Sequence, residues 1–223
     1  SPAAAARTIT SIPQRLGYAS DEVEPFLTRP IPYVRGRHEV VQNLALVLAA
    51  VEGDQLSVSG ERLVGGANEV DSNWRLRFEI SDKDVAAAEA FLPTQPGRPL
   101  VAIHPGSGAA VKRWRSAAWA ELAMRLAVEH DAQVIFTGSA GEAELIDPVL
   151  ALLEAGPPLA RPPFSLAGQT SLGELAALYN RCALVVGPDS GPLHLAVAAG
   201  APTVHLYGPV DRRTFGPWGS PQR

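Results

Sequence analysis

Two short segments of this sequence combine glycine and serine with a charged side chain. Residues 104–108 read HPGSG and are followed by Lys112, and residues 188–194 read PDSGPLH. Small residues leave backbone N–H groups exposed, and such groups favour an anion where a helix begins. At ~4 Å and an effective dielectric constant near 20, a lysine attracts a phosphate by roughly 4 kcal/mol before desolvation costs. Both segments therefore predict contact with an anionic group such as a phosphate.

The elements that would position these segments are predicted from residue 98 onward, where short β-branched runs alternate with helical stretches. The predicted strands cover residues 100–104, 133–137, 164–167, 183–187 and 203–207, and the predicted helices cover residues 116–129, 141–153, 171–180 and 191–199. This alternation indicates successive βαβ units and a parallel sheet that is covered on both faces. In such an α/β, Rossmann-like, doubly wound domain, ligands bind beyond the carboxyl ends of the strands. Both segments follow such an end.

The first part of the chain has weaker patterns. We expect a loop over residues 1–37 with a short strand around 7–12, a helix over 38–50, a linker over 52–73, an edge strand over 75–80 and a helix over 82–92. Ser81 and Asp84 have the spacing of a capping box for the last of these helices.

Composition and missing motifs narrow the class of protein. The 223 residues carry a formal net charge of −4, and a protein that binds nucleic acid through its phosphates is usually basic. One cysteine and five histidines in no metal-ligand spacing predict neither a disulfide framework nor a metal site. P-loop and dinucleotide glycine motifs are absent, and Ser190 lacks the GxSxG elbow of hydrolases. Without a recognisable signal peptide or spanning stretch, we expect a cytoplasmic protein that binds a phosphate-bearing ligand without metal or cofactor.

The region from about residue 98 to residue 219 carries several spaced motifs in order, namely HPGSG with VKRW, FTGSAGE, and SLAGQTSLGELAALYNRCALVVGPDSGPLHLAVAAGAPTVHLYGPVDRRTFGPWG. Together they resemble glycosyltransferase family 9, the ADP-heptose:lipopolysaccharide heptosyltransferases, which have the two-domain GT-B fold. The resemblance implies that residues 69–223 form the C-terminal, nucleotide-sugar-binding domain. Residues 1–68 would then be a remnant of the N-terminal, acceptor-side domain with the connecting helix.

The resemblance also implies which residues lie at the donor, an ADP-sugar. They are Gly106, Ser107, Gly108, Lys112, Glu142, Asp189, Ser190, Gly191 and His194. The glycines and serine of the first turn would lie along the diphosphate, and Lys112 would neutralise it. The second turn would present its helix start to the phosphates, with Asp189 accepting sugar hydroxyls and His194 one turn further along. Glu142 would lie near the ribose.

The implied reaction is inverting transfer of heptose from ADP-heptose to a lipopolysaccharide inner-core acceptor. Lys112 and Asp189 would be the catalytic contacts, because Lys112 and the amides of residues 189–191 would stabilise the charge on departing ADP, so that no metal is expected. The general base of the family lies in the first domain, and residues 1–50 offer no counterpart. We therefore expect this chain to supply the donor-binding half, with peripheral association at the inner membrane and no indication of oligomeric state.

Several alternatives remain open. A nucleotide-sugar epimerase of the same fold group also uses a Ser/Gly-rich helix start at the phosphates, and a non-catalytic nucleotide-sugar-binding fragment needs no general base. Residues 112–115 also fit a solvated basic turn, and Asp189 fits a helix cap. His104 and His194 fit core packing, and Glu142 fits a first-turn partner of the helix dipole.

Overall fold

The computed structural model describes residues 13–51, 75–92 and 97–218. The strand expected around residues 7–12, the linker over 52–73 and the predicted domain border after residue 68 lie outside the described residues. The chain divides into two compact units, one of residues 1–74 with 213–215 and one of residues 75–212 with 216–223.

Over residues 13–51 of the first unit, two short parallel strands accompany a long helix. Its elements are β1 (Leu16–Tyr18), η1 (Glu24–Phe26), β2 (Arg29–Ile31) and α2 (Glu39–Val51). The helix predicted over residues 38–50 is confirmed. The loop predicted over residues 1–37 is wrong for β1 and β2, which pair from Leu16↔Arg29 to Tyr18↔Ile31. Strands of three residues are too short to show a periodic pattern.

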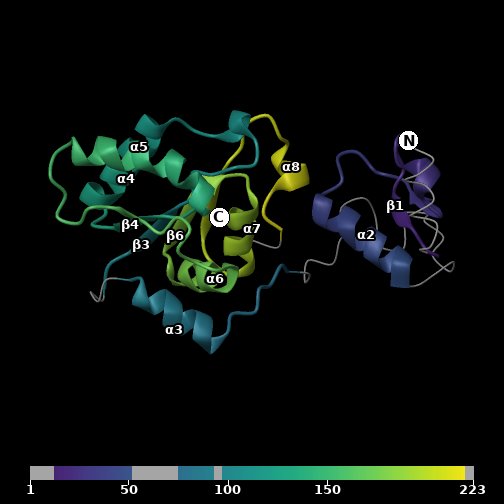
Figure 1. Ribbon diagram of the computed structural model, residues 1–223, viewed down its shortest axis with the longest axis horizontal. Coiled ribbons are helices and arrows are strands. Elements are labelled where there is room, and N and C mark those ends of the chain that lie inside the picture. The colour runs from purple at the N-terminus through teal and green to yellow at the C-terminus, as the bar shows by residue number, and fades with distance from the viewer. Residues whose placement is uncertain (1–12, 52–74, 93–96, 219–223) are drawn as a thin grey trace. The chain divides into compact units, whose positions relative to one another are not determined.

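The second unit contains a parallel sheet of five strands in the order β5-β4-β3-β6-β7, of which Figure 1 labels β3, β4 and β6. The strands are β3 (Leu100–Ile103), β4 (Gln133–Phe136), β5 (Phe164–Ser165), β6 (Leu184–Pro188) and β7 (Thr203–Leu206). All four pairings between neighbours are parallel. The doubly wound, Rossmann-like fold predicted from the alternation is therefore confirmed. Because β3 pairs with both β4 and β6, the strand order reverses at β3.

Helices follow the strands as the alternation predicts. They are α3 (Asp82–Ala90), η3 (Ala110–Lys112), α4 (Ser116–Glu129), η4 (Ala140–Glu142), α5 (Ala143–Glu154), α6 (Leu172–Arg181) and α7 (Gly191–Ala198). A short helix, α8 (Arg212–Phe215), follows β7, and most of its residues belong to the first unit. Capping boxes begin α3 and α6, where the Ser81 and Ser171 side chains accept from the backbone N–H groups of Asp84 and Glu174. Gly200, just past α7, has a φ of +84°, which favours glycine.

The edge strand predicted over residues 75–80 is wrong, because this segment forms no strand and pairs with none among the described residues. Its backbone contact is to a helix instead, since the N–H of Phe78 donates to the carbonyl of Ala198. Phe78 and Ile80 pack against Ala176, Leu195 and Ala199. The alternation of apolar and polar residues over 75–80 thus indicates one buried face. Helices α6 and α7 cover that face, and no neighbouring strand among the described residues pairs with the segment.

Helices cover both faces of the sheet (Figure 1). Each cover packs against the sheet in an apolar layer. On one face, Ala102 and Val185 pack with residues of α3, α6 and α7, including the fully buried Tyr179. On the other face, Ile103 packs with α4 and α5. Successive residues of β3 therefore belong to opposite layers, as expected for a strand buried on both faces. This double cover fixes the carboxyl ends of β3 and β6, from which the candidate residues extend.

Candidate functional site

The two glycine-containing turns lie side by side, because β3 and β6 are neighbours in the sheet. The N–H of His104 donates to the carbonyl of Val186 at 2.8 Å, so the pairing continues to the start of the first turn. Further along, the Ser107 hydroxyl lies 3.4 Å from the carbonyl oxygen of Asp189. The strand order reverses between β4 and β6 at this edge, which is where doubly wound sheets bind ligands. The structure thus brings together both segments singled out in the sequence.

A partly buried ion pair joins the two turns. Lys112 lies at the end of η3, and its Nζ is 2.7 Å from Oδ2 of Asp189. The side chains of Lys112 and Asp189 are 21% and 6% exposed, so the carboxylate is the deeper partner. Asp189 does not cap α7, since Ser190 occupies the N-cap position. The Asp189 carboxylate is therefore held by Lys112 rather than by the helix start.

His194 extends this pair along the first turn of α7. Its Nε2 lies 3.3 Å from Oδ1 of Asp189, and its ring meets the ring of His205 with centroids 5.5 Å apart. His205 in turn stacks on Tyr207 with centroids 6.1 Å apart. Burial lowers the pKa of His205 to about 4, helped by repulsion from His194 and opposed by Asp189. A row of polar side chains therefore runs from Lys112 along the carboxyl ends of the strands to β7.

Some polar atoms at this end of the sheet are buried and have no hydrogen-bond partner in the part of the chain that the structure describes. They are Oγ of Ser190, both ring nitrogens of His205 and the hydroxyl of Tyr207. Burial also raises the pKa of Tyr207 to about 12. Buried polar groups are usually hydrogen-bonded, so these atoms mark a polar region that the protein's own contacts leave unsatisfied.

Gly106 and Glu142 are in close contact. A Cβ at Gly106 would lie 1.9 Å from Oε1 of Glu142, so only glycine fits there without moving the carboxylate. The other oxygen, Oε2, accepts from the Ser139 N–H at 2.7 Å and from its hydroxyl at 2.9 Å. Burial raises the pKa of Glu142, but the two hydrogen bonds from Ser139, helped by the nearby Arg113, lower it by more, so the net shift is downward. Glu142 is thus ionised, with Oε1 as its less committed oxygen.

The remaining residues of the first turn differ in their surroundings. Ser107 is 6% exposed, and its carbonyl accepts from Nε and Nη2 of Arg113, both at 3.3 Å. Gly108 is exposed, and a Cβ there would meet no atom of the described residues within 4 Å. Arg113 therefore holds the turn at Ser107, while Gly108 borders open space. Residues 112–115 are therefore only partly the solvated basic turn that the sequence also allowed, because Lys112 and Arg113 make contacts within the site.

The sequence singled out no role for two side chains beneath this site, Thr137 and Tyr179. Thr137 Oγ1 lies 2.8 Å from the Tyr179 hydroxyl and 3.2 Å from Nδ1 of His104. All three residues are at most 2% exposed. Nε2 of His104 is 3.9 Å from Oε1 of Glu142, so this buried chain ends at the site. Tyr179 was not singled out because its sequence neighbours are mostly apolar. Its phenol hydroxyl is the one feature that could have distinguished it from an ordinary core residue.

The arrangement suits an anion with hydroxyl groups on either side. Lys112 provides a cation beside the N-terminus of α7, and both favour negative charge. Asp189 and Glu142 are hydrogen-bond acceptors for hydroxyls. Across residues 13–51, 75–92 and 97–218, no group of three or more His, Cys, Asp or Glu side chains is placed to hold a metal ion.

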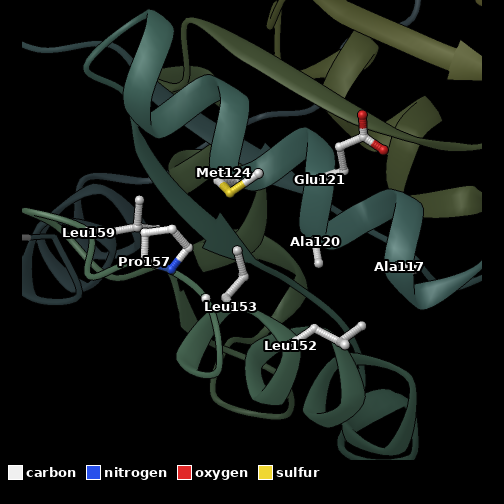
Figure 2. A pocket seen from close by; sticks show the side chains of 9 residues that line it. Ala117, Ala120, Glu121, Met124, Leu152, Leu153, Pro157 and Leu159 are labelled. Atoms are coloured by element: carbon white, nitrogen blue, oxygen red, sulfur yellow. The ribbon is translucent and has the colours of Figure 1, made fainter.

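A separate apolar groove lies between α4 and α5 (Figure 2). It has a volume of about 210 Å³ and contains none of the candidate residues. Its lining consists of Ala117, Ala120, Glu121, Met124, Leu152, Leu153, Gly156, Pro157 and Leu159. With one charged side chain, it lacks the groups needed to hold a phosphate.

None of the helices in the described part of the chain is both long enough and apolar enough to span a membrane.

Comparison with protein families gives a match over nearly the whole chain. The model of glycosyltransferase family 9 (heptosyltransferase) matches residues 3–223. Among curated proteins, the chain is 34% identical over 144 residues to lipopolysaccharide core heptosyltransferase OpsX of Haemophilus influenzae, covering 64% of this chain and 38% of that protein. It is 37% identical over 114 residues to lipopolysaccharide heptosyltransferase 2 of Escherichia coli, covering 50% and 32%. The matches thus span well under half the length of these relatives.

Solved structures show the same likeness. The structure of E. coli ADP-heptose lps heptosyltransferase II is 25% identical with a TM-score of 0.72, covering 94% of this chain and 60% of that one. The glycosyltransferase family 9 structure from Veillonella parvula is 25% identical with a TM-score of 0.69, covering 93% and 54%.

Proposed function

The chain belongs to glycosyltransferase family 9, the heptosyltransferases, and on that premise we propose that it binds ADP-heptose for transfer of heptose to a lipopolysaccharide inner-core acceptor. One observation carries the proposal. Lys112 and Asp189 come from turns 77 residues apart and meet at 2.7 Å where the strand order reverses. The matches to two relatives whose names include heptosyltransferase span only 38% and 32% of those proteins, and this chain is proposed as the donor-binding half.

The diphosphate is proposed to lie between Lys112 and the N-terminus of α7. Gly106, Ser107 and Gly108 line one side, where Gly108 borders open space. Lys112 then exchanges its contact with Asp189 for a phosphate oxygen. The freed carboxylate accepts hydrogen bonds from sugar hydroxyls. His194, whose Nε2 lies 3.3 Å from Oδ1 of Asp189, donates a hydrogen bond to the sugar on the same side.

The nucleoside is proposed to lie toward Glu142. Oε2 of Glu142 is committed to Ser139, and Oε1 is available to accept the ribose hydroxyls. Because the net shift of the Glu142 pKa is downward, the carboxylate stays ionised at neutral pH. A charged acceptor forms the stronger kind of hydrogen bond with a hydroxyl donor.

The proposed transfer is inverting. The acceptor oxygen attacks the anomeric carbon from the side opposite ADP, the bond from that carbon to the β-phosphate oxygen breaks, and the acceptor proton passes to a base in the acceptor-side domain. Negative charge develops on the departing phosphate. Lys112 and the amides of Ser190 and Gly191 stabilise that charge, and we propose that no metal or cofactor takes part. Because the acceptor is a lipid, the enzyme is proposed to act in the cytoplasm at the inner-membrane surface.

Separate titrations with ADP, UDP and GDP test the donor assignment. We expect ADP to bind most tightly, and equal affinities for all three nucleotides would overturn it. Incubation with ADP-heptose alone separates the transferase from an epimerase of the same fold group. An isomer of the donor appearing without acceptor would favour the epimerase.

A further inference from the structure

Three buried polar side chains form a hydrogen-bonded chain that the proposed function does not use. Tyr179 on α6 lies 2.8 Å from Thr137, which follows β4, and Thr137 lies 3.2 Å from Nδ1 of His104, which follows β3. Their exposed fractions are 0%, 1% and 2%. Polar groups so deeply buried are costly unless each donor has an acceptor. The direction of each hydrogen bond can therefore be worked out by following the protons.

The Tyr179 hydroxyl donates. Burial raises the pKa of Tyr179, so the phenol keeps its proton at neutral pH. Thr137 Oγ1 is its one acceptor among the described side chains and backbone. The Thr137 hydroxyl then has its own proton to place, and Nδ1 of His104 is its other partner. This direction leaves neither hydroxyl proton without an acceptor.

His104 must then carry its proton on the other nitrogen. Burial lowers the pKa of His104, while the Glu142 carboxylate and hydrogen bonding to the Thr137 backbone oppose that shift without outweighing it. The ring is thus neutral and has one N–H. With Nδ1 accepting, the proton is on Nε2, which faces Oε1 of Glu142 at 3.9 Å. The other tautomer could donate to the Thr137 backbone carbonyl, but it would leave the Thr137 hydroxyl proton without an acceptor and direct the Nε2 lone pair at the Glu142 carboxylate.

We propose that Tyr179 and Thr137 are positioning residues that hold His104 as its Nε2–H tautomer, which orients the free oxygen of Glu142 toward the ligand. The N–H reaches Oε1 through a bridging water or by a small approach of the carboxylate. Oε2 is already fixed by Ser139, so both oxygens are then oriented. The part that concerns the ribose rests on the proposed function, whereas the tautomer does not.

Nuclear magnetic resonance of the ¹⁵N-histidine-labelled chain tests the tautomer without any nucleotide. His104→Gln identifies the His104 signals. We expect the wild-type Nδ1 to show the shift of an unprotonated nitrogen. Thr137→Val, which keeps the shape but removes the hydroxyl, should populate both tautomers, and Thr137→Ser should retain the wild-type signal. Tyr179→Phe frees the Thr137 hydroxyl to turn and should give a smaller change than Thr137→Val. A proton on Nδ1 in the wild type, or no response to Thr137→Val, overturns the proposal.

Calorimetry with ADP and 2′,3′-dideoxy-ADP tests the consequence for the ligand. In the wild type, ADP should bind more tightly than the dideoxy analogue. Thr137→Val should reduce that ratio about tenfold, the size of one charge-assisted hydrogen bond, while Thr137→Ser preserves it. A ratio unchanged by Thr137→Val, with ADP still bound, overturns the inference but leaves the proposed function intact. Failure of the wild type to bind ADP overturns the proposed function, and the tautomer is then decided by the resonance experiment alone.

Discussion

Replacing Asp189 with asparagine removes the negative charge that holds Lys112 but keeps the shape of the side chain. At 2.7 Å and an effective dielectric constant of about 20, the attraction between Lys112 and Asp189 is roughly 6 kcal/mol before desolvation costs. On the same scale, a phosphate ~5 Å from the carboxylate is repelled by roughly 3 kcal/mol per unit charge. Asp189 thus competes for the cation and repels the anion.

We therefore expect Asp189→Asn to strengthen the binding of bare ADP. Because Lys112 is 21% exposed, solvent screens both interactions, and a gain of about 1–2 kcal/mol remains, equivalent to about 5- to 30-fold. ADP-heptose should not share this gain, since its sugar loses hydrogen bonds to a charged acceptor. The preference for ADP-heptose over ADP should consequently fall by about tenfold or more.

Isothermal titration calorimetry with both ligands measures this preference directly. Asp131→Asn is the matched control, because Asp131 pairs with Arg98 in an exposed ion pair and should leave both affinities unchanged. Equal losses of affinity for ADP and ADP-heptose in Asp189→Asn would refute the reasoning, because they would mean that Asp189 acts by holding the turn in shape.

Three further predictions concern neighbouring residues. Lys112→Ala should weaken ADP-sugar binding by about 1–3 kcal/mol in calorimetry, and an unchanged affinity would make Lys112 a mere surface cation. Gly106→Ala should displace Glu142, since the new Cβ would lie 1.9 Å from Oε1, and should weaken ADP binding, whereas Gly108→Ala, which meets no described atom within 4 Å, should be mild. The pKa of His205 falls from 6.5 to about 4 on folding, so the unfolded chain binds more protons between these values, and stability falls as pH drops through that window. Denaturant titrations should show a loss of up to about 3 kcal/mol, absent in His205→Gln.

The sequence predicted the second unit well because its signals are local. Helix α4 begins and ends where the pattern predicted, at residues 116 and 129, and Ser171 with Glu174 marked the start of α6 correctly. The segment over residues 75–80 was mistaken for a strand because alternation reveals a buried face but not its partner.

The candidate site was only partly predictable for a related reason. Each turn was recognised as suited to an anion, but the ion pair between Lys112 and Asp189 depends on β3 lying next to β6. Strand order is set by packing across the whole sheet, so spacing along the chain does not reveal it. Thr137 and Tyr179 escaped notice because buried polar side chains in apolar runs resemble ordinary core until their hydrogen bonds are known.

A crystal structure of the chain soaked with ADP would test the central proposition most directly. The β-phosphate is expected within hydrogen-bond distance of Lys112 Nζ and of the first amides of α7, with the ribose hydroxyls on Glu142 and the lysine drawn away from Asp189. ADP bound elsewhere, or bound while Lys112 stays paired with Asp189 and out of reach of both phosphates, would contradict it.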